Sequence, residues 1–97
     1  MAYPPAVVLV LPLSSPEALA PFVERCIVDR VALIAVWGPG CRRMEDDIDE
    51  LVVGDGTDES RHVTTSAHPD ESLEDAVEMA RFWVTEDGRS GVQIVKF

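Results

Sequence analysis

Residues 31–37 read VALIAVW and run directly into the turn Gly38-Pro39-Gly40. A short, continuous, β-branched and apolar run of this kind is typical of a strand whose two faces are both buried. Residues 6–11 read AVVLVL and have the same character. We therefore expect these two strands to lie at the centre of a mainly parallel sheet.

Three amphipathic stretches alternate with the strands and indicate helices. Apolar side chains recur at helical spacing within residues 19–27, 41–52 and 73–84. Pro21 lies inside the first stretch and is expected to delay the regular helix until after it, because proline lacks a backbone N–H. The expected boundary residues are Ser14 or Ser15 and Pro16 at the start of the first helix, Gly54 at the end of the second, and Asp70 or Ser72 and Gly88 around the third.

Two weaker strands complete the pattern and suit the edges of the sheet. Residues 62–67, HVTTSA, are rich in threonine but poor in bulk, and residues 92–97, VQIVKF, carry the polar Gln93 and Lys96. Strand and helix alternate with short connections, which predicts parallel crossovers. The sequence therefore predicts one domain over residues 1–97, a small three-layer βαβαβαβ α/β fold. Its mainly parallel four-stranded sheet should have the order 3-2-1-4, with 2-1-3-4 as the alternative.

Acidic residues dominate the charge of the chain. Eighteen Asp and Glu stand against eight Lys and Arg, which gives a formal net charge of −10 at pH 7. This charge disfavours nucleic-acid backbones and anionic membrane surfaces by repulsion. Residues 45–59 hold eight of the acidic residues and no Lys or Arg. We therefore expect a basic protein surface as the partner, and neither a nucleic acid nor a membrane.

Cysteine content and hydropathy favour the cytoplasm. The chain has two cysteines, Cys26 and Cys41, fewer than a disulfide-rich secreted domain of this size would carry. Residues 1–15 contain an apolar run without a basic residue before it or a small-residue cleavage pattern after it, so no signal peptide is expected. No stretch approaches the ~20 apolar residues that a membrane-spanning helix needs.

Candidate chemistry gathers where the second and third strands end. The second strand leads to Trp37 and Cys41, and the third leads to His68 and Asp70. A thiol in the first turn of a helix can be activated by the helix dipole, with His68 as the base and Asp70 orienting its ring. The competing interpretation is that Cys41 is a small buried hydrophobe, because it shares an apolar stripe with the helix that follows.

The glycine-containing turn and the acidic stretch have simpler interpretations. Gly38-Pro39-Gly40 lacks the spacing of a dinucleotide-binding loop and the Lys-Ser/Thr of a P-loop, which favours a tight turn that needs glycine. The order of carboxylates in residues 46–58 does not fit an EF-hand loop, and no Cys or His spacing indicates zinc. We therefore expect no metal and no cofactor.

Residues 31–83 contain a series of short motifs: WGPGC at 37–41, the Asp46-Asp47 pair, and HVTT followed by HPDESLE within residues 62–74. In these motifs the chain resembles the DUF7684 family of small bacterial proteins of unknown function. This chain departs from the pattern by carrying Ser66-Ala67 before the histidine, where a tryptophan is expected. The resemblance implies a bacterial origin and a functional crevice, but no reaction. It singles out Trp37, Gly38, Cys41, Asp46, Asp47, Thr64, Thr65, His68, Asp70 and Glu71.

Two functions fit these features. The first is a non-enzymatic binding or accessory protein, of the immunity or partner type, which uses its acidic face to engage a basic protein. The alternative is a small enzyme or small-molecule sensor with Cys41, His68 and Asp70 as candidate catalytic residues. A homodimer through the strand at residues 92–97 is a further possibility. The expected ligand- or partner-binding residues are Trp37, Gly38, Asp46, Asp47, Thr64, Thr65 and Glu71.

Overall fold

The sheet and helices alternate along the chain as the sequence indicates. The structure, a computed structural model, describes residues 2–58, 60–83 and 85–97, so Glu59 of the acidic stretch and Val84 of the third helical stripe lie outside it. No helix in these ranges combines the length and the apolar character needed to cross a bilayer. The elements are β1 (Ala6–Val10), the 3-10 turn η1 (Pro16–Ala18), α1 (Leu19–Val28), β2 (Leu33–Trp37), α2 (Cys41–Val53), β3 (Thr64–His68), α3 (Leu73–Arg81) and β4 (Val92–Val95).

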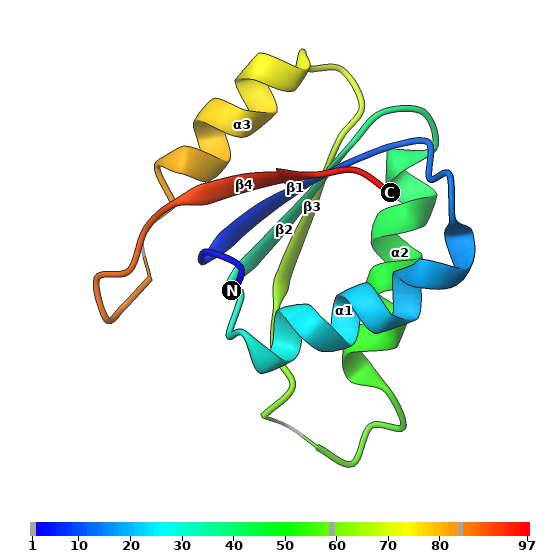
Figure 1. Ribbon diagram of the computed structural model, residues 1–97, viewed down its shortest axis with the longest axis vertical. Coiled ribbons are helices and arrows are strands. Elements are labelled where there is room, and N and C mark those ends of the chain that lie inside the picture. The colour runs from blue at the N-terminus through cyan, green and yellow to red at the C-terminus, as the bar shows by residue number, and fades with distance from the viewer. Residues whose placement is uncertain (1, 59, 84) are drawn as a thin grey trace.

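The four strands form one parallel sheet in the order β3-β2-β1-β4, which confirms the predicted order. β1 and β2 occupy the centre. All five residues of β1 are buried, and so are the residues of β2 before Trp37. The partly polar strands β3 and β4 lie at the two edges (Figure 1). Continuous apolar runs therefore take the central positions because only there are both strand faces covered.

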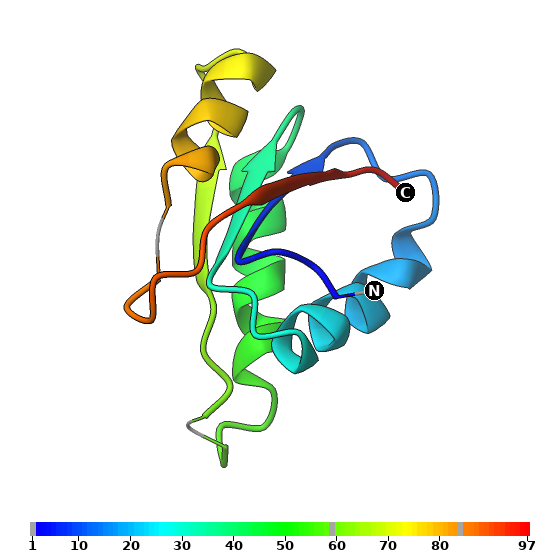
Figure 2. The same ribbon diagram turned by 60° about the vertical axis from the view of Figure 1, so that its left-hand side comes forward.

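Helices cover both faces of the sheet and make three layers, as predicted. α1 and α2 pack on one face, against alternate side chains that include Val7 and Ile34. α3 packs on the other face, against a smaller cluster that includes Val8 and Ala35. Figure 2 shows α3 on the opposite side of the strands from α1 and α2. The period-two alternation of a strand thus divides one apolar run between two cores.

Two predicted helix boundaries are wrong. α1 begins at Leu19 and includes Pro21, because the missing N–H of Pro21 falls in the first turn, where helical N–H groups have no acceptor within the helix. α3 ends at Arg81, seven residues before Gly88. The backbone N–H groups of Phe82 and Trp83 bond to carbonyls of the last turn, which closes the helix early.

The weaker strands are also shorter or shifted relative to the sequence pattern. β3 spans Thr64–His68 instead of residues 62–67, because each of its residues pairs with one residue of β2. β4 ends at Val95, where its pairing with β1 ends. The central strands therefore set the limits of the edge strands, whose own sequences mark them poorly.

The turn between β2 and α2 requires glycine at one position. Gly38 has φ = 117°, and a Cβ there would lie 2.8 Å from the carbonyl oxygen of Leu11. Gly40 is also left-handed, with φ = 75°, but its Cβ position faces open space. This close approach of two backbones accounts for Gly38 without a phosphate ligand.

Candidate functional site

The turn after β2 and the segment after β3 are neighbours at the carboxyl end of the sheet. Trp37, the last residue of β2, is the register partner of His68, the last residue of β3. The indole Nε1 of Trp37 donates a hydrogen bond of 2.8 Å to the carbonyl oxygen of Glu71. The two segments therefore meet where open α/β sheets commonly bind ligands.

His68 is buried, and both of its ring nitrogens have partners. Nε2 lies 2.8 Å from the hydroxyl oxygen of Ser66, and Nδ1 lies 2.9 Å from a carboxylate oxygen of Glu71. Because a carboxylate only accepts hydrogen bonds, Nδ1 carries the hydrogen atom and donates the hydrogen bond to Glu71. In the neutral ring Nε2 is then the acceptor for the Ser66 hydroxyl. This hydrogen-bonded chain holds the imidazole as a base directed at a hydroxyl group.

The carboxylate that orients His68 belongs to Glu71 and not to Asp70, the residue that the sequence suggested for this role. Glu71 lies three residues after His68, and its side chain reaches back to the ring. The bond from Trp37 to its carbonyl oxygen fixes the same residue at a second point. Asp70 itself is exposed. The sequence alone does not show which of two adjacent carboxylates contacts the histidine ring, because this depends on the backbone conformation of the turn after β3.

Cys41 and His68 lie on opposite sides of the sheet. Cys41 is the first residue of α2, is 2% exposed, and belongs to the core between the sheet and helices α1 and α2. On β3 the hydroxyl of Thr65 donates to Asp49 of α2 at 2.6 Å, so Thr65 faces that same core side. His68 is three residues later, so the alternation of the strand places its side chain on the other face. The structure does not bring the Cys41 thiol and the His68 imidazole together.

The other residues that the sequence singled out are spread over separate surfaces. Gly38 shapes the turn below Trp37. Asp46 and Asp47 are exposed on α2. Thr64 begins β3, at the end of the strand away from the imidazole, and lines a pocket there.

Helix α2 carries a group of carboxylates that we call the α2 acidic surface: Glu45, Asp46 and Asp49. Their carboxylate oxygens lie within 4.8 Å of one another. Burial raises the pKa of Glu45, the charges of Asp49 and Asp46 raise it further, and the charge of His68 acts in the opposite direction. None of the three pairs with a basic side chain within residues 2–58, 60–83 and 85–97. Oxygen ligands at this spacing suit a divalent cation, and exposed carboxylates also gather without one.

Comparison with known proteins assigns the chain to a family. The model of DUF7684, a domain of unknown function, matches residues 2–94, nearly the whole chain. The chain belongs to the DUF7684 family. No curated protein and no solved structure matches it. Membership confirms the resemblance seen in the sequence, and the family description attaches no activity to it.

The DUF7684 chain also has a pocket that sequence reasoning missed. The pocket has a volume of about 590 Å³ and lies at the amino ends of β2 and β3, away from His68. Residues of its wall come from three segments of the chain: 27–32, 60–64 and 83–89. No local motif marks these segments, since each contributes only a few side chains and only the fold gathers them.

Proposed function

We propose that this chain is a small non-enzymatic binding protein, of the accessory or immunity type, that engages a basic protein through the α2 acidic surface. The observation that supports this most is the group of three carboxylates within 4.8 Å of one another, without a basic partner in the described chain. Asp47 on the same helix and the remaining acidic residues of the stretch extend the charge.

Repulsion within the α2 acidic surface is a cost to the free protein. The pKa of Glu45 is raised chiefly by burial and then by the charges of Asp49 and Asp46, and only the contribution of these two charges is repulsion. The positive charges of a basic partner would attract these carboxylates and offset their mutual repulsion, which would stabilise the complex relative to the free protein. Such a surface is therefore better suited to binding than to stabilising its own fold.

The charge of the whole molecule acts in the same direction. With a net charge of −10, the chain attracts a basic protein at long range and speeds their encounter. Salt screens this attraction between exposed charges. The affinity for the partner should therefore fall steeply as the ionic strength rises.

The test compares two variants with the same change in net charge. The first neutralises the α2 acidic surface as Glu45→Gln, Asp46→Asn and Asp49→Asn, which keeps an acceptor for Thr65. The matched control neutralises three acidic residues of α3 as Glu74→Gln, Asp75→Asn and Glu78→Gln. Proteins that bind the wild-type chain in extracts of its native cell are identified, and their affinities for all three chains are measured by calorimetry between about 0.05 and 0.5 M salt.

We expect the α2 variant to lose the partner and the α3 variant to retain most of its affinity. Equal affinities for the two variants would assign the binding to net charge alone and contradict the proposed surface. An affinity that does not change with salt would contradict the electrostatic basis itself.

The alternative function, a small enzyme or sensor at the carboxyl end of the sheet, has one observation in its favour. The hydrogen-bonded chain Ser66–His68–Glu71 has the order of nucleophile, base and orienting carboxylate. The test is labelling by a serine-directed fluorophosphonate, with Ser66→Ala and His68→Gln as controls. Labelling that requires both side chains would support catalysis, and its absence from the wild-type chain would leave the chain of hydrogen bonds a structural role.

We also propose that the exposed edge of β4 can join two copies of the chain. β4 lies at the end of the sheet, and the side chain of Ile94 is 51% exposed there. An unpaired strand edge is a template for pairing across a two-fold axis. Light scattering during size-exclusion chromatography should give a dimer mass for the wild type and a monomer mass for Ile94→Lys. A monomer at all concentrations would refute it.

A further inference from the structure

The pocket at the amino ends of β2 and β3 has the size and lining of a ligand site. Its volume of about 590 Å³ lies within the range of small-molecule pockets, roughly 300 to 1,000 Å³. Trp83, Ile27 and Val31 supply apolar lining, and Arg30, His62 and Arg89 supply basic and polar groups. The pocket is at the opposite end of the strands from His68 and is separate from the α2 acidic surface.

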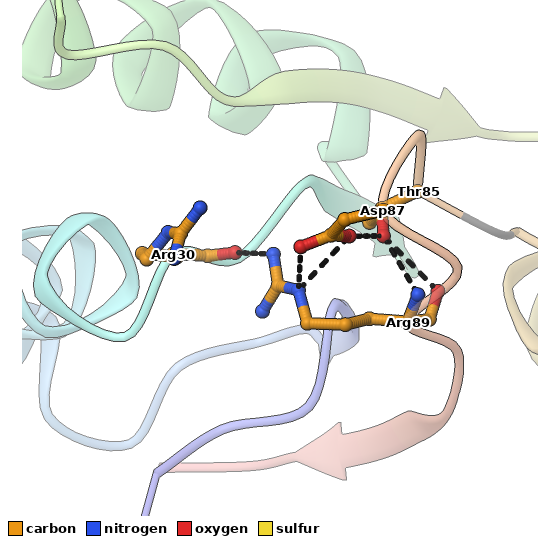
Figure 3. A network of polar contacts seen from close by, with 4 residues as sticks. All are labelled: Arg30, Thr85, Asp87 and Arg89. Carbon is orange, nitrogen blue, oxygen red and sulfur yellow. Dashed lines mark hydrogen bonds and ion pairs between the residues drawn. The ribbon is translucent and has the colours of Figure 1, made fainter.

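One wall of the pocket is held rigid by a network of polar contacts (Figure 3). The guanidinium of Arg89 donates to both carboxylate oxygens of Asp87, at 3.3 and 3.2 Å, and to the carbonyl oxygen of Arg30 at 3.0 Å. The hydroxyl of Thr85 donates to Asp87 and accepts from the backbone N–H of Arg89. These contacts join the segment after α3 to the segment before β2, so the wall is formed before any ligand arrives.

Arg30 differs from the other residues of this network. Its φ of 62° makes it the non-glycine residue with a left-handed backbone in the described chain. Its carbonyl oxygen is fixed by Arg89, whereas its guanidinium pairs with no carboxylate among the residues described. The left-handed backbone belongs to the ending of α1, where the N–H of Arg30 bonds to the carbonyl oxygen of Ile27 and the N–H of Val31 bonds to that of Cys26. What distinguishes Arg30 in the pocket is therefore its guanidinium, which has no ion pair among the described residues.

The charged groups of the pocket are two guanidiniums and two carboxylates, and Arg30 is the guanidinium without an ion pair among the described residues. Asp87 is already neutralised by Arg89, and Glu86 is the remaining carboxylate of the lining. Arg30 and the exposed ring of His62 are left to contact a ligand. Three basic or imidazole side chains thus line the pocket beside two carboxylates, and the choice of an anion rests on the guanidinium of Arg30. A guanidinium recognises carboxylates and phosphates through paired hydrogen bonds.

We propose that this pocket binds a small organic anion, namely a carboxylate or phosphate on a flat apolar body. Arg30 contacts the anionic group, and Trp83 with the aliphatic side chains of Ile27 and Val31 contacts the body. This binding goes beyond the proposed function, because neither the α2 acidic surface nor a protein partner takes part in it. The protein would then join a small-molecule site at one end of the sheet to a protein-binding helix at its side.

The test uses three probes of nearly equal shape: indole-3-acetate, neutral indole-3-acetamide and cationic tryptamine. Binding is followed by two-dimensional amide NMR, which also locates the site. We expect indole-3-acetate to bind with a dissociation constant on the order of 1 mM, as for a ligand of this size, and to shift the amides of residues 30–32, 62–64 and 85–89. The neutral and cationic probes should bind at least about tenfold more weakly.

Arg30→Gly tests the role of the guanidinium without disturbing the backbone, since glycine adopts a φ of 62° freely. It should weaken the binding of indole-3-acetate at least about tenfold, whereas Arg42→Ala, which removes an equal charge from α2, should not. Stronger binding of tryptamine would show that Glu86 governs the pocket and would overturn the proposal. Equal binding of all three probes, shifts confined to other residues, or no binding of the anion would also overturn it.

Discussion

Replacing Gly38 by alanine should destabilise the protein strongly, because the turn after β2 brings two backbones together there. The new Cβ would lie 2.8 Å from the carbonyl oxygen of Leu11 and 3.1 Å from its Cβ. Leu11 is itself buried, so it has little room to move. The substitution also places a side chain at φ = 117°, where L-residues are strained.

The magnitude follows from these two effects. Backbone strain of this kind costs about 1–3 kcal/mol, and forcing extra atoms into a packed core costs about 1–3 kcal/mol. Taken together, and reduced by the smaller entropy of the unfolded alanine variant, the expected loss is about 3 kcal/mol. A chain of this length has a stability of roughly 5 to 15 kcal/mol, so the loss is a large fraction of the total.

Gly40→Ala is the matched control within the same turn. It has φ = 75°, but no atom lies within 4 Å of its Cβ position, so only strain applies. We expect it to lower the free energy of unfolding by no more than about 1 kcal/mol. Unfolding in urea, followed by circular dichroism and tryptophan fluorescence, should show a midpoint lowered by about 1 to 3 M for Gly38→Ala and by about a third of that shift or less for Gly40→Ala. Equal shifts for the two variants would refute the contact with Leu11 as the reason for glycine.

Three further predictions test separate parts of the structure. Ser72→Ala should lower the free energy of unfolding by about 1 kcal/mol, because its side chain accepts from a backbone N–H at the start of α3, whereas Ser15→Ala, at a position without such a bond, should change it little. Cys26 and Cys41 should react with a thiol reagent only after unfolding, since both are buried and burial, with a smaller effect of Asp29, raises the pKa of Cys26 to about 12; fast reaction of folded protein would contradict this. The backbone N–H of Tyr3, and then the guanidinium of Arg25, lower the pKa of Asp29. Asp29→Asn should therefore be less stable than the wild type above about pH 4, and the difference should vanish as the pH falls through the lowered pKa of the folded wild type. A difference in stability that persists in strong acid would point to another cause.

Part of the candidate site at His68 could be predicted from the sequence, and part could not. The pairing of Trp37 with His68 follows from the strand order, which the apolar runs had indicated. The face of the strand on which His68 lies depends on register, and a shift of one residue reverses it. The predicted strand ended at residue 67, so His68 lay outside it without an assigned face, and its separation from Cys41 could not be predicted.

The pocket around Arg30 could not be predicted from the sequence. Arg89 reaches the carbonyl oxygen of Arg30 across 59 residues of sequence. Neither residue stands in a motif, and the left-handed backbone of Arg30 has no signature in a sequence that offers no glycine or asparagine there. Sites built from single side chains of distant loops leave no periodic pattern to detect.

The sequence by itself determined the number, kind and order of the elements, because burial on two faces, on one face or on a helical stripe each leaves its own spacing of apolar residues. It also determined the acidic character of α2 and the placement of β1 and β2 at the centre. Only the tertiary structure decided where the edge strands begin, which sheet face each polar side chain occupies, and which loops meet around the pocket. These depend on pairing with residues far away in the chain, and such pairing is a property of the assembled sheet, which no local pattern carries.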